Sequence, residues 1–337
     1  MPKNPLVLRP QDFMKLFICS LLCASLVAGQ ELRHSFNDKK APDSAKDLQA
    51  IQSALQDALP RVRQATVCIN LDEGSGTGVI VSPDGLILTA AHVSAGVKKK
   101  VTVQLEDGTE LKAISLGLVA DTDAAMVQII EKGTYPFVEI DRAATAKLGD
   151  WVFALGHSGG FDKERGLVVR LGRLVRIANS TFQSDCTLIG GDSGGPLFDM
   201  NGKLIGIHSR VAARVGENMH VPMSEFITNW DAMSQSEFIG EGPFAQKPVK
   251  GSGFLGLATE PCKQGGLKVT MVGEKSPAQD AGLVAGDVLL KLNGTALESR
   301  EQMQSLIKEM AKGDEVNLET TRRGKAKNYT FNLGARS

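Results

Sequence analysis

Short apolar and β-branched runs, separated by turns rich in Gly, Asp and Ser, dominate the chain from residue 65 to about residue 229. Runs of this length and composition predict β-strands. The predicted strands cover residues 66–69, 77–81, 86–89, 101–105, 126–130, 151–155 and 203–207. Because no long helical pattern lies between them, we expect barrels or a sandwich here.

The N-terminal pattern differs from the rest. An apolar run at residues 16–27 follows Lys15 and ends in small residues, and it is too short to span a bilayer comfortably. It predicts a signal peptide over residues 1–29, with Met14 as an alternative start; a retained N-terminal anchor is the competing interpretation. After cleavage we expect no integral membrane segment.

Residues 30–60 are predicted to form a disordered polar lead followed by one amphipathic helix. The helix should cover residues 45–59 and end before Pro60. Its apolar positions recur at helical spacing: Leu48, Ile51, Leu55 and Leu59.

A second domain is expected at residues 253–337, after a first domain at 61–240 and a linker rich in Gly and Pro at 241–252. Its predicted strands cover residues 254–258, 267–272, 287–292, 316–321 and 328–333. One amphipathic helix is predicted between them from the stripe Met303, Leu306, Ile307 and Met310.

The composition argues against nucleic-acid binding and against a metal site built from cysteines. Lys plus Arg and Asp plus Glu are both 38 of 337 residues, so no net charge favours nucleic acid as a partner. Beyond the predicted signal peptide the cysteines are Cys68, Cys186 and Cys262, with no CxxC or Cys/His cluster. They are predicted to be buried or free thiols rather than metal ligands.

A serine lies in the glycine-rich stretch 190–196, which reads Gly-Gly-Asp-Ser-Gly-Gly-Pro. Acyl transfer by a serine needs a base, a carboxylate that holds the base, and backbone donors for the oxyanion. Ser193 is the candidate nucleophile, and the amides of Gly191 and Ser193 are the candidate oxyanion hole. Taken alone, the same stretch could be an ordinary turn.

Two further residues complete a candidate triad. His92 directly follows an apolar strand, where its ring can face a cleft, so it is the predicted base. Asp123 is the predicted carboxylate because it lies nearer than Asp121 to the apolar strand at 126–130; Asp121 competes for this role.

With these residues in the order His, Asp, Ser, the chain resembles the HtrA/DegP-type proteases. The matching segments are residues 74–89, 122–127 and 191–197. The resemblance implies a mostly β fold, with a chymotrypsin-like double barrel holding the triad between its barrels and a small α+β PDZ domain after it. It also implies no metal or organic cofactor, a periplasmic or extracytoplasmic location, and unfolded or misfolded proteins as substrates.

The resemblance also bears on assembly. The family typically forms homotrimers through the N-terminal part of the protease domain, here the helix at 45–59 and its lead, but no aromatic cluster there supports a homotrimer.

The chain departs from the family pattern around the nucleophile. Asp192 replaces the usual Asn, and we expect Arg210 or Arg214 to neutralise it. The pair Ile189-Gly190 replaces a common Asn-Pro, which predicts a loop that is disordered at rest.

His157 stands in a Gly-rich turn and is predicted to be a turn residue, with the substrate cleft as an alternative position. The absence of a carboxylate near the expected pocket wall predicts a small or medium apolar residue before the cut site. The expected wall residues are Thr187, Leu188, Ile205 and Ile207.

In the second domain, residues 253–257 resemble the carboxylate-binding loop of HtrA-type PDZ domains, which binds peptide C-termini by strand addition. The candidate groove residues are Phe254, Leu255, Gly256, Leu257, Met303 and Ile307. The predicted function is therefore an exported serine endopeptidase with a peptide-binding domain. The alternative is a proteolytically weak chaperone or scaffold that binds unfolded chains through the cleft and the groove.

Overall fold

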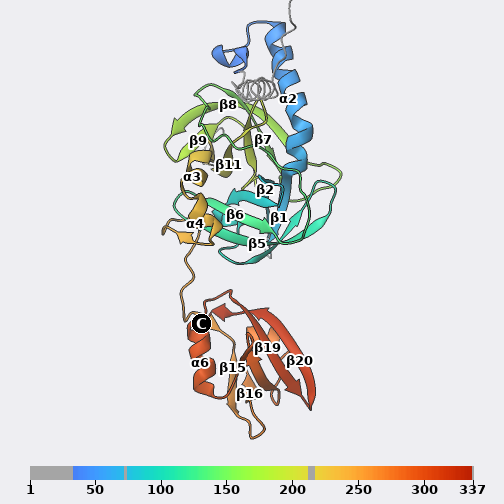
Figure 1. The fold of residues 1–337 in the computed structure, drawn as a ribbon, viewed down its shortest axis with the longest axis vertical. Coiled ribbons are helices and arrows are strands. Elements are labelled where there is room, and N and C mark those ends of the chain that lie inside the picture. The colour runs from blue at the N-terminus through green and yellow to red at the C-terminus, as the bar shows by residue number, and fades with distance from the viewer. Residues whose placement is uncertain (1–32, 72–73, 212–216, 336–337) are drawn as a thin grey trace, which may run out of the picture. The chain divides into compact units, whose positions relative to one another are not determined.

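The computed structural model describes residues 33–71, 74–211 and 217–335. The chain divides into two compact units, and the boundary in the sequence falls between Ala245 and Gln246 (Figure 1). This division falls inside the range 241–252 expected as a linker. The predicted signal peptide lies outside the described residues, and no described helix is both long and apolar enough to cross a bilayer.

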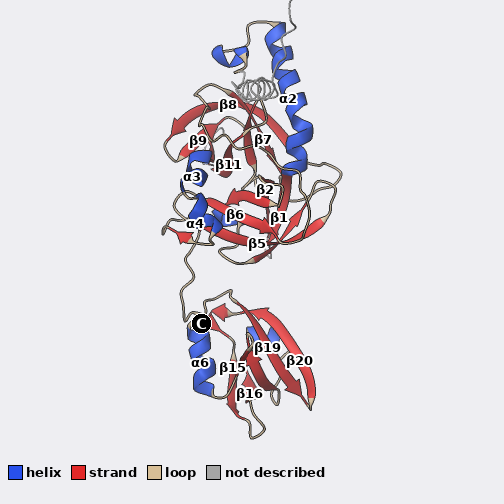
Figure 2. Ribbon diagram, viewed as in Figure 1, coloured by secondary structure: helices blue, strands red, loops and turns tan. Residues whose placement is uncertain are grey.

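The first unit is built mainly from strands (Figure 2). Six of them close a barrel in the order β5-β4-β1-β2-β3-β6, because β5 also pairs with β6. The strands are β1 (Thr66–Leu71), β2 (Gly74–Ile80), β3 (Leu86–Ala90), β4 (Lys100–Gln104), β5 (Glu110–Val119) and β6 (Ala124–Ile129). The two-residue strand β13 (Phe238–Ile239) adds to β5 in parallel.

A second six-stranded barrel closes in the order β10-β11-β12-β9-β8-β7. Its strands are β7 (Trp151–Gly156), β8 (Val168–Ala178), β9 (Thr181–Ser184), β10 (Pro196–Asp199), β11 (Leu204–Val211) and β12 (Asn218–Pro222). The short helices α3 (Met223–Thr228) and α4 (Trp230–Ser234) follow. The predicted double barrel is confirmed.

The N-terminal helix is longer than predicted. Helix α2 (Ala45–Ala65) continues through Pro60, although an interior proline costs a helix about 3 kcal/mol. Packing explains the difference, because the buried face continues beyond Pro60 to Val62 and Ala65, which are fully buried. Exposed Leu48 is the member of the predicted stripe that does not pack inward.

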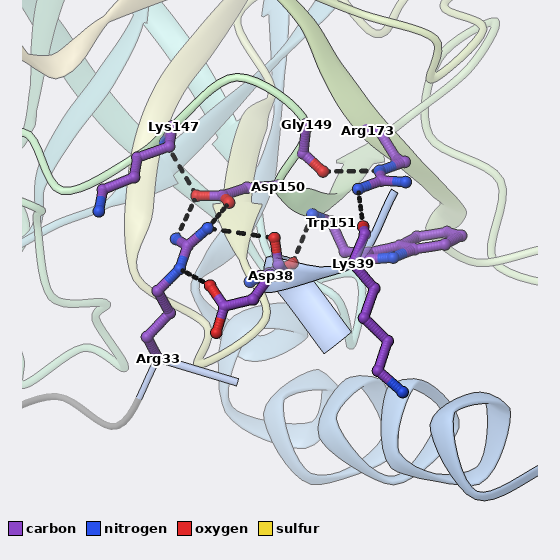
Figure 3. Close-up of polar contacts among 9 residues, drawn as sticks. Arg33, Asp38, Lys39, Lys147, Gly149, Asp150, Trp151 and Arg173 are labelled. Carbon is purple, nitrogen blue, oxygen red and sulfur yellow. Dashed lines mark hydrogen bonds and ion pairs between the residues drawn. The ribbon is translucent and has the colours of Figure 1, made fainter. Parts of the chain in front are cut away.

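The lead before α2 is ordered over its described residues, contrary to the expected disorder. It forms the 3-10 helix η1 (Ser35–Asp38) and is held against the second barrel (Figure 3). The Arg33 guanidinium donates to both carboxylate oxygens of Asp150, and this bond raises the pKa of Arg33. The Trp151 amide donates to the Asn37 side chain at 2.8 Å, and Arg173 donates to backbone carbonyls of the lead. These polar contacts, together with the buried ring of Phe36, hold the lead in place.

The second unit is a sheet with two helices. Its main path is β15-β16-β17-β19-β20, with β18 beside β17, while β14 pairs with β21. The strands are β14 (Gly253–Phe254), β15 (Leu257–Pro261), β16 (Leu267–Val272), β17 (Val288–Leu292), β18 (Thr295–Ala296), β19 (Glu315–Arg322), β20 (Lys325–Asn332) and β21 (Gly334–Ala335). The helices are α5 (Pro277–Asp280) and α6 (Arg300–Lys308), the latter capped by the Ser299 side chain.

The single strand predicted at 254–258 is split into β14 and β15. The break falls at Gly256, whose φ of +81° lies in the left-handed region. A Cβ there would come within 2.1 Å of the Ser276 Cβ, so the close approach also requires glycine.

Candidate active site and peptide groove

His92 and Asp123 form a close pair at one end of the first barrel. His92 lies in the 3-10 turn η2 (Ala91–Val93) directly after β3, and Asp123 immediately precedes β6. The ring Nδ1 of His92 is 3.0 Å from each carboxylate oxygen of Asp123. The carboxylate is fully buried, whereas the His92 side chain is 38% exposed. A buried carboxylate therefore holds a ring whose other side reaches solvent.

Three donors fix the Asp123 carboxylate. Besides the His92 ring, the His92 amide donates to Oδ1 at 3.1 Å and the Ser209 hydroxyl donates to Oδ2 at 2.6 Å. Asp123 has a φ of +69°, a left-handed conformation that aspartate tolerates better than most residues. The competitor Asp121 is exposed and points toward Gly240 instead. Of the two candidates, Asp123 is the one that contacts His92.

Ser193 lies where the two barrels meet. Its carbonyl accepts a hydrogen bond from the Thr77 amide of β2 at 2.8 Å. The next residue, Gly194, has a φ of +82°, and a Cβ there would come within 2.1 Å of the Thr77 carbonyl. No larger side chain fits at this position. Within the described residues the Ser193 hydroxyl makes no hydrogen bond, and such bonds are often open in unliganded enzymes.

The candidate oxyanion hole is held from two sides. The Gly191 carbonyl accepts from the Thr77 hydroxyl at 2.7 Å, and the Gly190 carbonyl accepts from the Gly159 amide at 2.7 Å. Across a trans peptide the N–H points opposite to the preceding C=O, so the Gly191 N–H points away from Gly159. Neither the Gly191 nor the Ser193 amide donates to a protein acceptor in the described part of the chain. Both donors are therefore available to a ligand.

Asp192 is neutralised by a residue that the sequence did not single out. Its fully buried carboxylate pairs with Arg170 of β8 at 3.0 Å and accepts from the Ser158 hydroxyl and the Ile189 amide. The expectation of Arg210 is wrong, because that guanidinium stacks on Phe244, 5.1 Å from the ring centroid. The other expected partner, Arg214, lies outside the described residues. The Asp192–Ile189 bond also orders the loop that was expected to be disordered.

A cavity of about 110 Å³ adjoins Ser193. Its lining contains no carboxylate: Leu188, Ile189, Gly190, His208, Ser209, Arg210 and Val211. Of the four wall residues expected from the sequence, Leu188 lines it, whereas Thr187 is exposed and the two isoleucines belong to the barrel cores. The sequence analysis missed the C-terminal half of β11, which contributes residues 208–211 to the lining.

Buried histidines support the nucleophile turn. His208 exchanges backbone hydrogen bonds with Gly194 and Gly195, and its Nδ1 lies 2.9 Å from the Nδ1 of His220. The His220 Nε2 lies 2.7 Å from the Ser184 hydroxyl. Burial lowers the pKa of His208 well below its ordinary value and that of His220 to about 3. Both rings are therefore neutral at physiological pH.

His157 is buried rather than open to the cleft, and burial lowers its pKa to about 4. Cys68 and Cys186 are buried free thiols, and Cys262 is a half-buried free thiol. Burial raises the pKa of Cys68 to about 11, so this thiol is unreactive at neutral pH.

The second unit has a groove of about 290 Å³ between β15 and α6. All six residues that the sequence singled out line it: Phe254, Leu255, Gly256, Leu257, Met303 and Ile307. The carbonyls of Leu255 and Gly256 accept from Ala278 and Gly273, while among the described residues their amides donate to no protein acceptor. Two free amides thus lie at one end of the groove.

The groove also has polar residues that the sequence analysis missed: Thr259, Arg300, Gln304 and Lys308. The last three recur every fourth residue along α6. That spacing was visible beside the apolar stripe and could have identified them.

Comparisons with known proteins identify both domains. Residues 76–207 match the trypsin-like peptidase domain and residues 253–333 match the PDZ domain. A probable periplasmic serine endoprotease DegP-like from Pseudomonas savastanoi pv. phaseolicola is 34% identical over 270 residues, covering 77% of this chain and 56% of the relative. One from Halomonas elongata is 31% identical over 278 residues, with the same two coverages.

The chain therefore spans about half the length of the curated relatives it matches. Among solved structures, a serine endoprotease from Yersinia pestis is 24% identical with a TM-score of 0.48, covering 84% of this chain and 98% of that one. With a trypsin-like peptidase domain followed by a PDZ domain and with DegP-like relatives, the chain belongs to the HtrA/DegP-type proteases.

Proposed function

We propose that this chain is an exported serine endopeptidase that cleaves unfolded or misfolded proteins. The observation that carries the proposal is the buried Asp123 carboxylate, which holds His92 beside a Ser193 turn with two free amides. Export to the periplasm is supported by the names of the relatives, which are described as periplasmic.

The roles of the site residues in the proposed reaction follow from the chemistry of a serine triad. The Ser193 oxygen attacks the scissile carbonyl while its proton moves to the Nε2 of His92, and the Gly191 and Ser193 amides donate to the resulting oxyanion. His92 then gives the proton to the leaving amine, which departs as the C–N bond breaks. A water molecule then attacks the acyl-enzyme while His92 takes its proton. His92 returns that proton to the Ser193 oxygen as the acyl product leaves. Asp123 holds the ring with Nδ1 protonated and stabilises its positive charge.

The PDZ domain would capture substrates or regulate cleavage by binding peptide C-termini. The free amides of Leu255 and Gly256 suit a terminal carboxylate, and β15 is an edge strand to which a peptide can add. The implied homotrimer is a further proposal, which light scattering on the mature chain would test.

A fluorophosphonate probe tests the enzyme directly, because it reacts with an activated serine. We expect labelling of the wild type, no labelling of Ser193→Ala, and degradation of an unfolded model protein by the wild type alone. Cut sites mapped by mass spectrometry should follow small or medium apolar residues. If no label depends on Ser193 while the unfolded protein still binds, the scaffold alternative replaces the enzyme.

A further inference from the structure

Helix α6 places two unpaired cations along the groove of the PDZ domain. Arg300 and Lys308 line opposite ends of its helical wall, with Gln304 between them. In the described part of the chain neither cation has an ion-pair partner, whereas nearby Lys250 pairs with Glu309 at 2.7 Å. Met303 lies on the apolar floor beneath them. The groove therefore joins an apolar floor to a positive rim.

Thr259 adds an unsatisfied hydroxyl to the same groove. The residue is only 6% exposed, and its Oγ1 has no hydrogen-bond partner among the residues described. Leaving a buried hydroxyl without a hydrogen-bond partner carries a free-energy cost. A ligand that accepts a hydrogen bond from it would recover part of that cost.

The position of each group along a bound peptide follows from the strand directions. When its C-terminal carboxylate binds the amides of Leu255 and Gly256, the peptide pairs antiparallel to β15. Its earlier residues then lie progressively farther along β15 from Leu257. Leu257 and Thr259 both line the groove. If the last peptide residue lies beside Leu257, the third residue from its end lies beside Thr259.

Helix α6 brings Arg300 to the same place. Its C-terminal end adjoins the loop before β14, where the Met310 carbonyl accepts from the Gly251 amide at 2.9 Å. Arg300 lies seven positions before Ile307, about 10 Å along the helix. Two residues of extended peptide cover about 7 Å, and the arginine side chain spans the difference.

We propose that this groove selects protein C-termini with Asp or Glu as the third residue from the end. The Arg300 guanidinium pairs with that carboxylate, and the Thr259 hydroxyl donates to it. The inference rests on the proposed function of the groove as a C-terminus binder, and it adds the chemical class of the partner.

Fluorescence anisotropy on the full chain with Ser193→Ala, which prevents cleavage, would test the proposal. Four labelled peptides with a common apolar last residue are needed: Glu, Gln or Lys at the third position from the end, and the Glu peptide with an amidated terminus. We expect the Glu peptide to bind about tenfold more tightly than the Gln peptide, as for one charge-assisted hydrogen bond, and the Lys peptide to bind most weakly.

Two substitutions test whether Arg300 and Thr259 cause the preference for the Glu peptide. Arg300→Glu should reverse the order of the Glu and Lys peptides, and Thr259→Val should reduce the preference for Glu over Gln. The matched control is Lys325→Glu, which makes the same charge change on β20 at the opposite edge of the sheet and should keep the wild-type order.

Failure of the selectivity and failure of the groove give different results. Equal affinity for the Glu, Gln and Lys peptides, with loss of binding on amidation, overturns the selectivity while the groove function stands. Equal binding of the free and amidated termini, or no binding of any peptide, overturns both.

Discussion

The peptidase cleft and the PDZ groove each leave two backbone amides free, but they hold their functional side chains in opposite ways. In the cleft, buried side chains are held by several partners each, as Asp123 is by His92 and Ser209. In the groove, two backbone amides and the open edge of β15 are left free, and the long side chains on the rim are exposed. Chemistry on a bond requires side chains that are held in place, whereas binding of varied termini requires an open strand edge and exposed side chains.

The difference means that each site should respond to its own substitutions. Changes in the cleft should alter catalysis or stability and spare peptide binding. Changes in the groove should alter peptide binding and spare the hydrolysis of a small substrate.

The largest effect is expected from Asp123→Asn. An amide at this position would hold His92 in the wrong tautomer, and the corresponding change in other triads lowers kcat by about 10⁴. Hydrolysis of a chromogenic peptide measures it, with Asp121→Asn as the control that should stay near wild type. If Asp121→Asn abolishes hydrolysis and Asp123→Asn does not, Asp121 is the carboxylate of the triad. Affinity for a C-terminal peptide should not change in either variant.

Asp192→Asn should destabilise the peptidase domain. It leaves Arg170 charged, 15% exposed and without its carboxylate, and breaking one partner of a buried pair costs about 3–5 kcal/mol. Scanning calorimetry in the Ser193→Ala background should show the peptidase transition lowered, by about 10 °C, and the PDZ transition unmoved. Adding Arg170→Met should restore part of the loss. If Asp192→Asn and the double variant lower the melting temperature of the peptidase domain equally, the pairing of Asp192 with Arg170 does not stabilise the domain.

Ile307→Asp should weaken peptide binding and leave hydrolysis of a small substrate intact. It places a carboxylate in the groove near the terminal carboxylate of the peptide, and the affinity should fall at least about tenfold. Met271→Asp, an equal change at an exposed position on β16 outside the groove, serves as the control. Parallel loss in both variants would point to unfolding of the domain instead.

The smallest effect should be a change in the pH dependence of stability from His220→Gln. Burial lowers the pKa of His220 in the folded chain to about 3, below about 6.5 in the unfolded chain. Between these values the unfolded chain binds more protons, so its contribution is complete above about pH 6.5 and declines as pH falls toward 3. Melting temperatures from pH 7.5 to 4.5 should fall less steeply in the variant. His34→Gln is the control, and identical slopes in all three chains would rule out this role.

Local patterns predicted much of the fold. All seven strands predicted in the peptidase unit are present within a few residues, because half-buried alternation and turn residues act locally. The strands β5, β8, β9, β10 and β12 and the two-residue β13 escaped prediction; β8 exposes Leu171, Val175 and Ile177, so it lacks a clear alternation of apolar and polar faces, and β9 and β10 have four residues each. Helix α2 exceeded its predicted end because packing of Val62 outweighed the proline signal.

The sequence by itself determined which residues are chemically able to act: a serine in a glycine turn, a histidine after a strand and an aspartate before one. Only the tertiary structure decided that Asp123 rather than Asp121 contacts His92 and that Arg170 rather than Arg210 neutralises Asp192. The members of these pairs are 31 and 22 positions apart in the sequence, and the closure of the barrels brings them together. Local propensity does not encode which charged side chain a closed barrel brings to a buried carboxylate.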